Sequence, residues 1–267
     1  MKKKIDCITF FNENLMFDLR FKTLENFFDF FLICEAKHDH KGNKKKLNFN
    51  LSKYSNNKKI IYIIYEEPFK RNNTPWENQA KQRDFILKNL SFVEDNDYIF
   101  FSDPDEIPNP DLISNFNLSK KYGIFLQKCY NYKFNLFNPY ETPWEGTRVS
   151  KKKDLKSIDY LRQKIKLKNL KYKFYRIDKE KNIEIFNEGG WHFNNIMDPE
   201  EISLKLKTFA HSEFSSDKFS NPDLIKKKID NKNDLFERNH VYEQVLLDKT
   251  FPNYLTNNKE KYKKFIL

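Results

Sequence analysis

The sequence contains no hydrophobic run long enough to cross a membrane. Every apolar stretch falls well short of the roughly 18 residues that a transmembrane helix needs, and no hydrophobic region of the secretory type precedes the first polar residues. These absences predict a cytoplasmic protein. Peripheral attachment to a membrane through basic patches is a hypothesis that the composition leaves open.

Cysteine is rare, and linker sequences and internal repeats are not found. The three cysteines, Cys7, Cys34 and Cys129, lie in apolar runs without the paired spacing of a metal site, which indicates buried free thiols. No segment rich in Pro, Gly or Ser divides the chain. We therefore expect a single domain over residues 1–267, with 27 Phe and 14 Tyr to fill its core.

Helix-turn-helix and zinc signatures of nucleic-acid binding are also missing, although the chain is basic. Its 49 Lys plus Arg exceed its 38 Asp plus Glu by 11. The excess is mostly lysine, spread along the chain in short runs such as 2–4, 44–46, 151–153 and 226–228. A solvated surface explains this pattern, and so does a phosphate-bearing ligand.

Short apolar runs alternate with helical patterns in the first hundred residues. The runs are predicted strands, and they cover residues 5–11, 30–34, 60–65 and 98–101. Helical spacing is found between them, over 15–28 and 76–90. Continuous apolar strands separated by helices predict an α/β fold with a parallel sheet buried on both faces. Each run ends in polar residues, at the sheet edge where such folds bind ligands.

The second half of the chain is less regular. Pro199 and Pro222 stand where the first turn of a helix tolerates proline, and they predict helices over 199–209 and 222–229. Residues 154–168 are expected to form a basic helix. The runs 172–177 and 183–186 are expected to form a hairpin.

Two aspartates, Asp103 and Asp105, closely follow the apolar run at 98–101. Carboxylates separated by one residue at a strand end can converge on a divalent cation, and oxygen ligands suit Mg²⁺ or Mn²⁺, which usually complete their shell with substrate phosphates. A polar turn, with Asp111 capping the next helix, explains the same residues without a ligand. On the motif alone, both interpretations stay open.

Several segments, taken together, resemble glycosyltransferase family 17, which includes the bisecting N-acetylglucosaminyltransferase of N-glycans. The order and spacing match from about residue 8 to the end. The segments are Phe17-Asp18-Leu19-Arg20, Phe31-Leu32-Ile33-Cys34-Glu35-Ala36, Asp97-Tyr98-Ile99-Phe100-Phe101-Ser102-Asp103-Pro104-Asp105-Glu106-Ile107-Pro108, Gly190-Trp191-His192-Phe193 and Pro252-Asn253-Tyr254-Leu255.

The resemblance implies a fold of the GT-A type, which is an α/β architecture. Its central sheet is Rossmann-like, mixed but mostly parallel, and flanked by helices, and its C-terminal part is helical. Residues 1–110 would form the nucleotide-sugar-binding half and residues 111–267 the acceptor-side half. The resemblance also implies a UDP-sugar donor, UDP-N-acetylglucosamine in the best-known members, a divalent ion and inversion at the anomeric carbon. The acceptor, a glycan or a lipid-linked saccharide, stays open, as does the oligomeric state.

Carried onto this sequence, the resemblance makes Asp105 a metal ligand and Asp103 a ligand of the metal or of the donor ribose. Arg83, on the helix before the aspartates, would reach the donor phosphates, or else pair with Asp84 or Glu77 at the surface. Uridine contacts are expected at the ends of the first two strands, from Phe11, Asn12, Glu13 and Glu35. Glu35 has an alternative role as the cap of a loop.

A second cluster follows two glycines near residue 190. Trp191 offers a face for sugar stacking, and the resemblance makes His192 a late metal ligand rather than a core histidine. Glu188 or Glu213 would be the general base that removes the acceptor proton, and a surface ion pair is the other explanation for either. His211 is a competing metal ligand.

Two other function classes stay open on the residues alone. An acidic strand end also suits a metal-dependent phosphoryl hydrolase, but such sites commonly combine several histidines and aspartates, and the five histidines here share no metal-spacing motif. A basic, non-catalytic nucleic-acid-binding protein would use the net charge of +11. The resemblance favours a glycosyltransferase over both, without a nucleic-acid partner.

Overall fold

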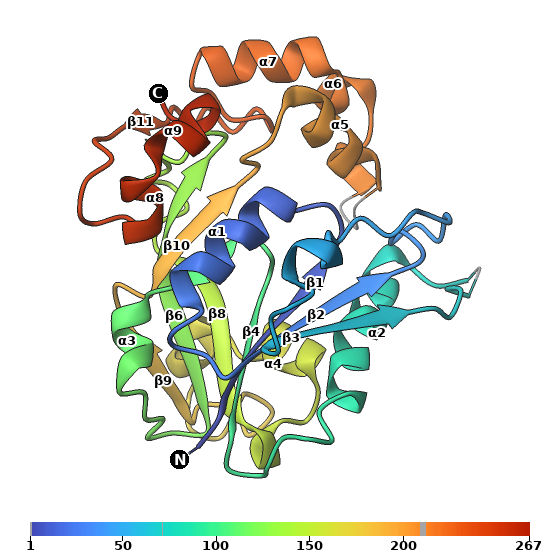
Figure 1. Cartoon of the computed structure of the whole chain (residues 1–267), viewed down its shortest axis with the longest axis vertical. Helices are drawn as coiled ribbons and strands as arrows, with labels where there is room; N and C mark the ends of the chain where they lie inside the picture. Colours follow the sequence, from blue (N-terminus) through green and yellow to red (C-terminus); the bar gives the residue numbers. More distant parts are fainter. Residues whose placement is uncertain (1, 71, 209–211) are drawn as a thin grey trace.

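The fold has a central sheet with helices on both faces (Figure 1). The structure is a computed structural model that describes residues 2–70, 72–208 and 212–267. The strands in this part of the chain are β1 (Lys4–Phe10), β2 (Phe30–Ala36), β3 (Ile60–Tyr65), β4 (Tyr98–Ser102), β5 (Glu106–Pro108), β6 (Tyr122–Asn131), β7 (Leu136–Phe137), β8 (Trp144–Lys151), β9 (Ile183–Phe186), β10 (Gly190–Asn194) and β11 (Glu243–Gln244). The predicted mixed α/β fold is confirmed.

The first four strands pair in parallel, in the order β3-β2-β1-β4. They correspond to the four apolar runs, which are continuous because helices cover both faces of this part of the sheet. In β4, Tyr98 and Phe100 pack into the core on one face, whereas Ile99 and Phe101 pack into the core on the other.

Antiparallel pairing begins at β8, which lies between β4 and β6. Strand β10 pairs in parallel with β6 and antiparallel with β5, so His192 lies opposite Glu106, just after the two aspartates. The predicted hairpin is wrong. Residues 172–177 form turns rather than a strand, and β9 pairs in parallel with β6 instead.

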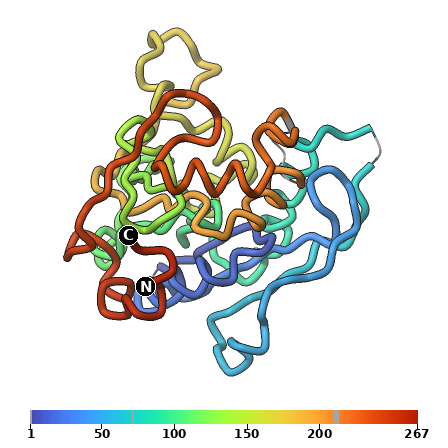
Figure 2. The backbone as a smooth tube through the Cα atoms, turned by 90° about the horizontal axis from the view of Figure 1, so that it is seen from above, coloured from blue at the N-terminus to red at the C-terminus, as the bar shows by residue number. Residues whose placement is uncertain are grey.

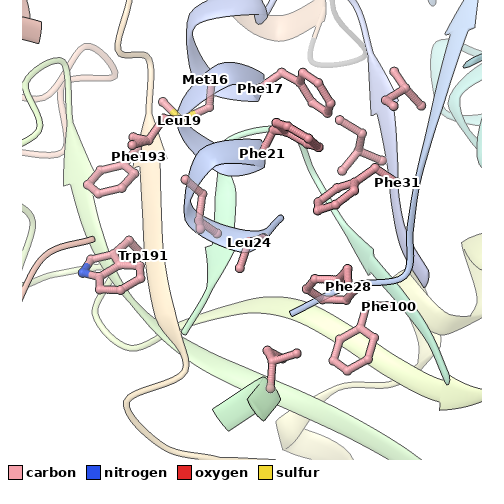
Figure 3. Packing of buried hydrophobic residues seen from close by; sticks show 14 of the residues in the cluster. Met16, Phe17, Leu19, Phe21, Leu24, Phe28, Phe31, Phe100, Trp191 and Phe193 are labelled. Carbon is pink, nitrogen blue, oxygen red and sulfur yellow. The ribbon is translucent and has the colours of Figure 1, made fainter. Parts of the chain in front are cut away.

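Helix α1 (Asn14–Leu24) covers one face of the parallel strands, and α2 (Pro75–Lys88) with α4 (Ile158–Lys164) covers the other. Figure 3 shows α1 directing Phe21 toward Phe31 of β2, with ring centroids 5.0 Å apart. The remaining α-helices are α3 (Pro110–Ser114), α5 (Pro199–Thr208), α6 (Asp217–Ser220), α7 (Pro222–Asp230), α8 (Asn253–Asn257) and α9 (Lys259–Tyr262). None of the helices in the described residues has the length and apolar character to cross a membrane.

The predicted helical C-terminal part is present, and it returns to the N-terminal helix (Figure 2). Lys261 of α9 forms an ion pair with the buried Asp18 of α1, and Lys53 pairs with the same carboxylate. Asp18 belongs to one of the segments that resemble the family. Its role in the structure is to join distant parts of the chain.

Arg20, from the same segment, is fully buried and fixes the end of β4. Its Nε and Nη2 atoms donate to Asp6 of β1 at 2.6 and 2.5 Å, and Nη2 also donates to Ser102 Oγ at 3.0 Å. Nη1 donates to the backbone oxygen of Glu106. The paired, hydrogen-bonded guanidinium therefore holds both ends of the turn that carries the two aspartates.

Candidate active site

A cavity of about 710 Å³ opens where β1 and β4 end, within the range of about 300–1,000 Å³ typical of small-molecule sites. Seven cationic residues line it, from both halves of the chain: Lys45, Arg83, Arg148, Arg162, Lys166, Lys205 and Arg238. The acidic lining residues are Glu13, Asp39, Asp103, Asp105, Glu141 and Glu145. The cavity therefore suits an anionic ligand bound among alternating charges.

Asp103 lines this cavity between two guanidinium groups. Its Oδ2 accepts a hydrogen bond from Arg162 Nη2 at 2.6 Å, and its Oδ1 accepts one from Arg83 Nη2 at 3.3 Å. Burial alone would raise the pKa of Asp103, but the charges of Arg162 and Arg83 outweigh it and hold that pKa below its usual range. Asp103 is thus ionised, with both oxygens already engaged.

Arg162 connects Asp103 to a second buried carboxylate. Its Nη2 lies 2.6 Å from Oε1 of Glu106, which is fully buried. The same oxygen accepts the indole N–H of Trp144 at 2.7 Å, and the Trp144 ring stacks on His192 with centroids 4.5 Å apart. This chain of contacts ties the aspartate turn to the imidazole on β10.

Arg83 reaches the cavity from α2, as expected, but it does not form the surface pairs that the sequence left open. The side chain is 3% exposed and pairs with Asp103 and, at 3.1 Å, with Asp159 of α4. Asp84 instead accepts the backbone N–H of Asp159 at 2.8 Å. Arg83 therefore links two helices to the aspartate turn while facing the cavity.

Asp105 lies beside one imidazole and one amine. Its Oδ1 is 3.5 Å from His192 Nε2, and its Oδ2 is 3.5 Å from Lys205 Nζ of α5. Burial alone would raise the pKa of Asp105, but Lys205 and His192 outweigh it and lower that pKa. The structure thus brings together the two residues that were expected to bind metal most directly.

The fit of a divalent ion depends on this pair. A ligand oxygen and nitrogen 3.5 Å apart can share one ion, whose bonds to such atoms are about 2.1 Å long. Within the described residues no group of three or more His, Cys, Asp or Glu side chains is arranged to hold a metal. Asp105 and His192 therefore fit an ion that takes its other ligands from water and substrate phosphates.

The four residues expected to contact uridine lie in different environments. Phe11 and Glu13 line the cavity, and Glu13 Oε2 accepts the backbone N–H groups of Phe11 and Asn12 at 2.8 and 2.9 Å. Asn12 is absent from the described lining. The carboxylate of Glu35 is fully buried and accepts the backbone N–H groups of Asn48 and Phe49 at 2.7 and 3.0 Å, which is the loop-capping arrangement.

Only some residues of the second predicted cluster lie at the cavity. His192 lines the cavity, whereas Trp191 points into the core and donates its indole N–H to the Thr250 carbonyl at 3.0 Å. Glu188 pairs with Lys128 at 3.0 Å, and its side chain is 75% exposed. Glu213 is exposed and outside the lining, and His211 lies outside the described residues.

Gly190 allows β10 to approach β5 rather than a ligand. Its φ is +119°, and a Cβ atom there would lie 2.1 Å from the backbone oxygen of Ile107. A larger residue would push β10 away from β5. This glycine therefore positions His192 beside the aspartate turn.

Sequence reasoning missed Arg162 and Lys205. Arg162 and Lys205 lie on predicted helices, but no motif distinguishes them from the many other basic residues. Their importance comes from side-chain contacts that join segments distant in the sequence.

Comparison with known proteins identifies the family but no close relative. The model of glycosyltransferase family 17 matches residues 1–267, whereas the curated proteins gave no match. Similar solved structures include HddC from Yersinia pseudotuberculosis, at 10% identity over 69% of this chain and 90% of that chain, with a TM-score of 0.39. A glycosyltransferase involved in glycosylation of the major capsid of PBCV-1 is 11% identical over 70% of this chain and 82% of that chain, with a TM-score of 0.32.

Those TM-scores are too low to add to the assignment, which depends on the family model. That model covers the entire chain, including the aspartate turn and the strand that carries His192. The protein belongs to glycosyltransferase family 17, and it is a glycosyltransferase.

Proposed function

We propose that the protein transfers a sugar, N-acetylglucosamine, from a UDP-sugar to a hydroxyl group of a glycan or lipid-linked saccharide, with the aid of Mn²⁺ or Mg²⁺ and with inversion. The observation that carries this proposal is the pair of Asp105 and His192, 3.5 Å apart in a cavity lined by cationic side chains. A donor diphosphate is the anion that such a site suits.

Asp105 and His192 are the residues that would hold the divalent ion. When bound, the ion would neutralise charge on the departing diphosphate. Lys205, 3.5 Å from Asp105, can donate to a phosphate oxygen at the same place. Arg83 also faces the cavity and has Asp103 as a partner, so its guanidinium is held in position before the donor arrives.

Asp103 has a positioning role in this proposal, with the donor ribose as its ligand rather than the metal. Both of its oxygens accept guanidinium N–H groups, and a carboxylate retains further acceptor sites for a ribose hydroxyl. Phe11 and Glu13, at the end of β1, would lie along the uracil side of the donor. Lys45 lies over the Phe11 ring, 5.1 Å from its centroid, and its ammonium group pairs with the buried carboxylate of Glu35.

The general base must face the cavity, since it takes a proton from the bound acceptor. Glu188 and Glu213 lie outside the described lining. We propose Glu141 and Glu145 as the better candidates, because both line the cavity on the side of the second half of the chain. Glu141 pairs with Arg238 at 2.7 Å, and Glu145 pairs with Arg148 at 3.2 Å.

A donor-hydrolysis and transfer assay tests the proposal. The purified protein is incubated with a panel of UDP-sugars in Mn²⁺ and, separately, in EDTA, and release of UDP is measured. We expect turnover of UDP-N-acetylglucosamine in Mn²⁺, and loss of at least 100-fold in Asp105→Asn, since a metal ligand and its charge are removed. The matched control Asp111→Asn changes an exposed residue of α3 and should retain turnover.

Two results would contradict the proposal. One is a folded protein that turns over no UDP-sugar in the panel. The other is an Asp105→Asn variant that retains the turnover of the Asp111→Asn control.

A further inference from the structure

The loop at residues 172–181 presents apolar side chains to solvent. Phe174 is 90% exposed, Ile177 is 95% exposed and Tyr175 is 59% exposed. In Figure 2 this segment, dark yellow, projects from the body of the molecule. Large apolar residues gathered at the tip of a projecting loop are typical of an interaction surface.

The loop and the segment that precedes it are rich in basic residues. Residues 164–181 contain eight Lys or Arg residues and two acidic residues, a net charge of +6 out of +11 for the whole chain. Seven of the eight cationic residues are lysines. Four of the six excess charges lie on residues 164–171, just before the loop, and residues 172–181 add two more. An exposed apolar tip that follows a basic segment suits an anionic surface.

Contacts within the loop hold it in shape. Lys181 Nζ donates to the backbone oxygens of Lys173 and Arg176 at 2.9 and 3.0 Å. The Arg176 guanidinium forms two hydrogen bonds of 2.7 Å with Asp178. These contacts use backbone and charged groups, so the apolar side chains at the tip remain outward. Because the loop is already held in shape, it loses little conformational entropy on docking.

We propose that the loop at residues 172–181 docks the protein on an anionic membrane surface, with Phe174 and Ile177 inserted at the level of the headgroups. Lysine pairs with anionic headgroups, and aromatic and aliphatic side chains enter the boundary between headgroups and acyl chains. A single-stranded nucleic acid fits less well, because Ile177 has no aromatic face on which a base can stack.

The loop is connected to the cavity through α4 and the short 3₁₀ helix at Leu167–Lys171. Arg162, Gln163 and Lys166 line the cavity, and the chain then continues directly to the loop. A protein docked through this loop would hold the cavity near the membrane, which favours a lipid-linked saccharide as acceptor. That consequence depends on the proposed function, whereas the docking itself does not.

Co-sedimentation with vesicles tests the docking. The full chain is mixed with vesicles of phosphatidylcholine alone or of phosphatidylcholine with phosphatidylglycerol, at low and high salt. We expect binding only to the vesicles that contain phosphatidylglycerol, weakened by high salt. The double variant Phe174→Ser/Ile177→Ser should bind at least tenfold more weakly. Asp105→Asn should bind normally, which separates docking from catalysis.

A matched control is Leu246→Ser, which removes another apolar side chain that is 85% exposed. It should leave vesicle binding unchanged. In Phe174→Trp, quenching of the new tryptophan by brominated lipids should show insertion of the tip.

Three results would overturn the proposal. The first is wild-type protein that stays in solution with phosphatidylglycerol vesicles. The second is an equal loss of binding in Leu246→Ser. The third is tight binding of poly(U) through the loop, together with no quenching of the tryptophan in Phe174→Trp by brominated lipids. That result would assign the loop to a nucleic acid.

Discussion

Substitution of Arg162 by methionine should destabilise the protein strongly. The side chain pairs at 2.6 Å with both Asp103 and the fully buried Glu106. Removing one partner of a buried ion pair leaves an uncompensated charge, at a cost of about 3–5 kcal/mol. For a chain of this size we expect the midpoint of thermal unfolding to fall by roughly 6–20 °C. Urea denaturation followed by circular dichroism gives the free energy of unfolding directly.

The matched control for this prediction is Arg176→Met. Arg176 forms two hydrogen bonds of 2.7 Å with Asp178, but the two side chains are 43% and 51% exposed. Because solvent screens this pair, the free energy of unfolding should stay close to that of the wild type. If Arg162→Met loses no more stability than this control, the buried network does not hold the aspartate turn as we argue.

The double variant Arg162→Met/Glu106→Gln provides a further check. It removes the buried charge together with its partner, so it should be more stable than Arg162→Met alone. If the losses of unfolding free energy in the two single variants simply add in the double variant, the two side chains are not directly coupled.

Three further predictions concern other parts of the cavity. Trp144→Phe keeps a ring stacked on the imidazole but removes the N–H donated to a buried carboxylate, and should cost about 1.5–3 kcal/mol in urea denaturation. Burial lowers the pKa of His40 from 6.5 to about 4. The stability that the neutral imidazole contributes is therefore present above pH 6.5 and is lost as the pH falls toward 4. Urea denaturation across this range should show a larger loss of unfolding free energy in the wild type than in His40→Gln. Glu188→Gln should leave kcat within about twofold, because the side chain is exposed and outside the described lining. If Glu141 or Glu145 is the base, as proposed, its replacement by Gln should lower kcat by about 10²–10⁴-fold. An equal loss in Glu188→Gln would return the role to that residue.

The strands of the first half were predictable because burial on both faces leaves a clear mark in the sequence. Continuous apolar runs at 5–11, 30–34, 60–65 and 98–101 became β1 to β4 with small changes in their ends. The run at 172–177 misled us because its aromatic residues resemble those of a strand. In the structure Phe174 is 90% exposed, which points to a surface role rather than to core packing.

The side-chain orientation of neighbouring residues was harder to predict. Trp191 and His192 were both placed in the site, yet successive residues of a strand point to opposite faces. His192 faces the cavity, so Trp191 must face the core, where Phe193 joins it. Strand alternation alone was enough to reject one of the two.

Partners that are distant in sequence were not predictable from local pattern. Arg83 was expected either to reach the donor phosphates or to pair with neighbours on its own helix. Its observed partners are Asp103 and Asp159, because β4 and α4 pack beside it. The approach of His192 to Asp105 depends on the pairing of β10 with β5. Only the family resemblance anticipated a shared role for those two residues.

The most direct test of the account is the effect of Mn²⁺ on the binding of UDP, measured by isothermal titration calorimetry. The protein is titrated with UDP in Mn²⁺ and in EDTA, and the two dissociation constants are compared for the wild type, Asp105→Asn, His192→Asn and the Asp111→Asn control. We predict that Mn²⁺ tightens the Kd of the wild type and of the control at least tenfold and has little effect on the other two variants. An equal effect of Mn²⁺ on all four proteins, or no effect on the wild type, would contradict the assignment of Asp105 and His192.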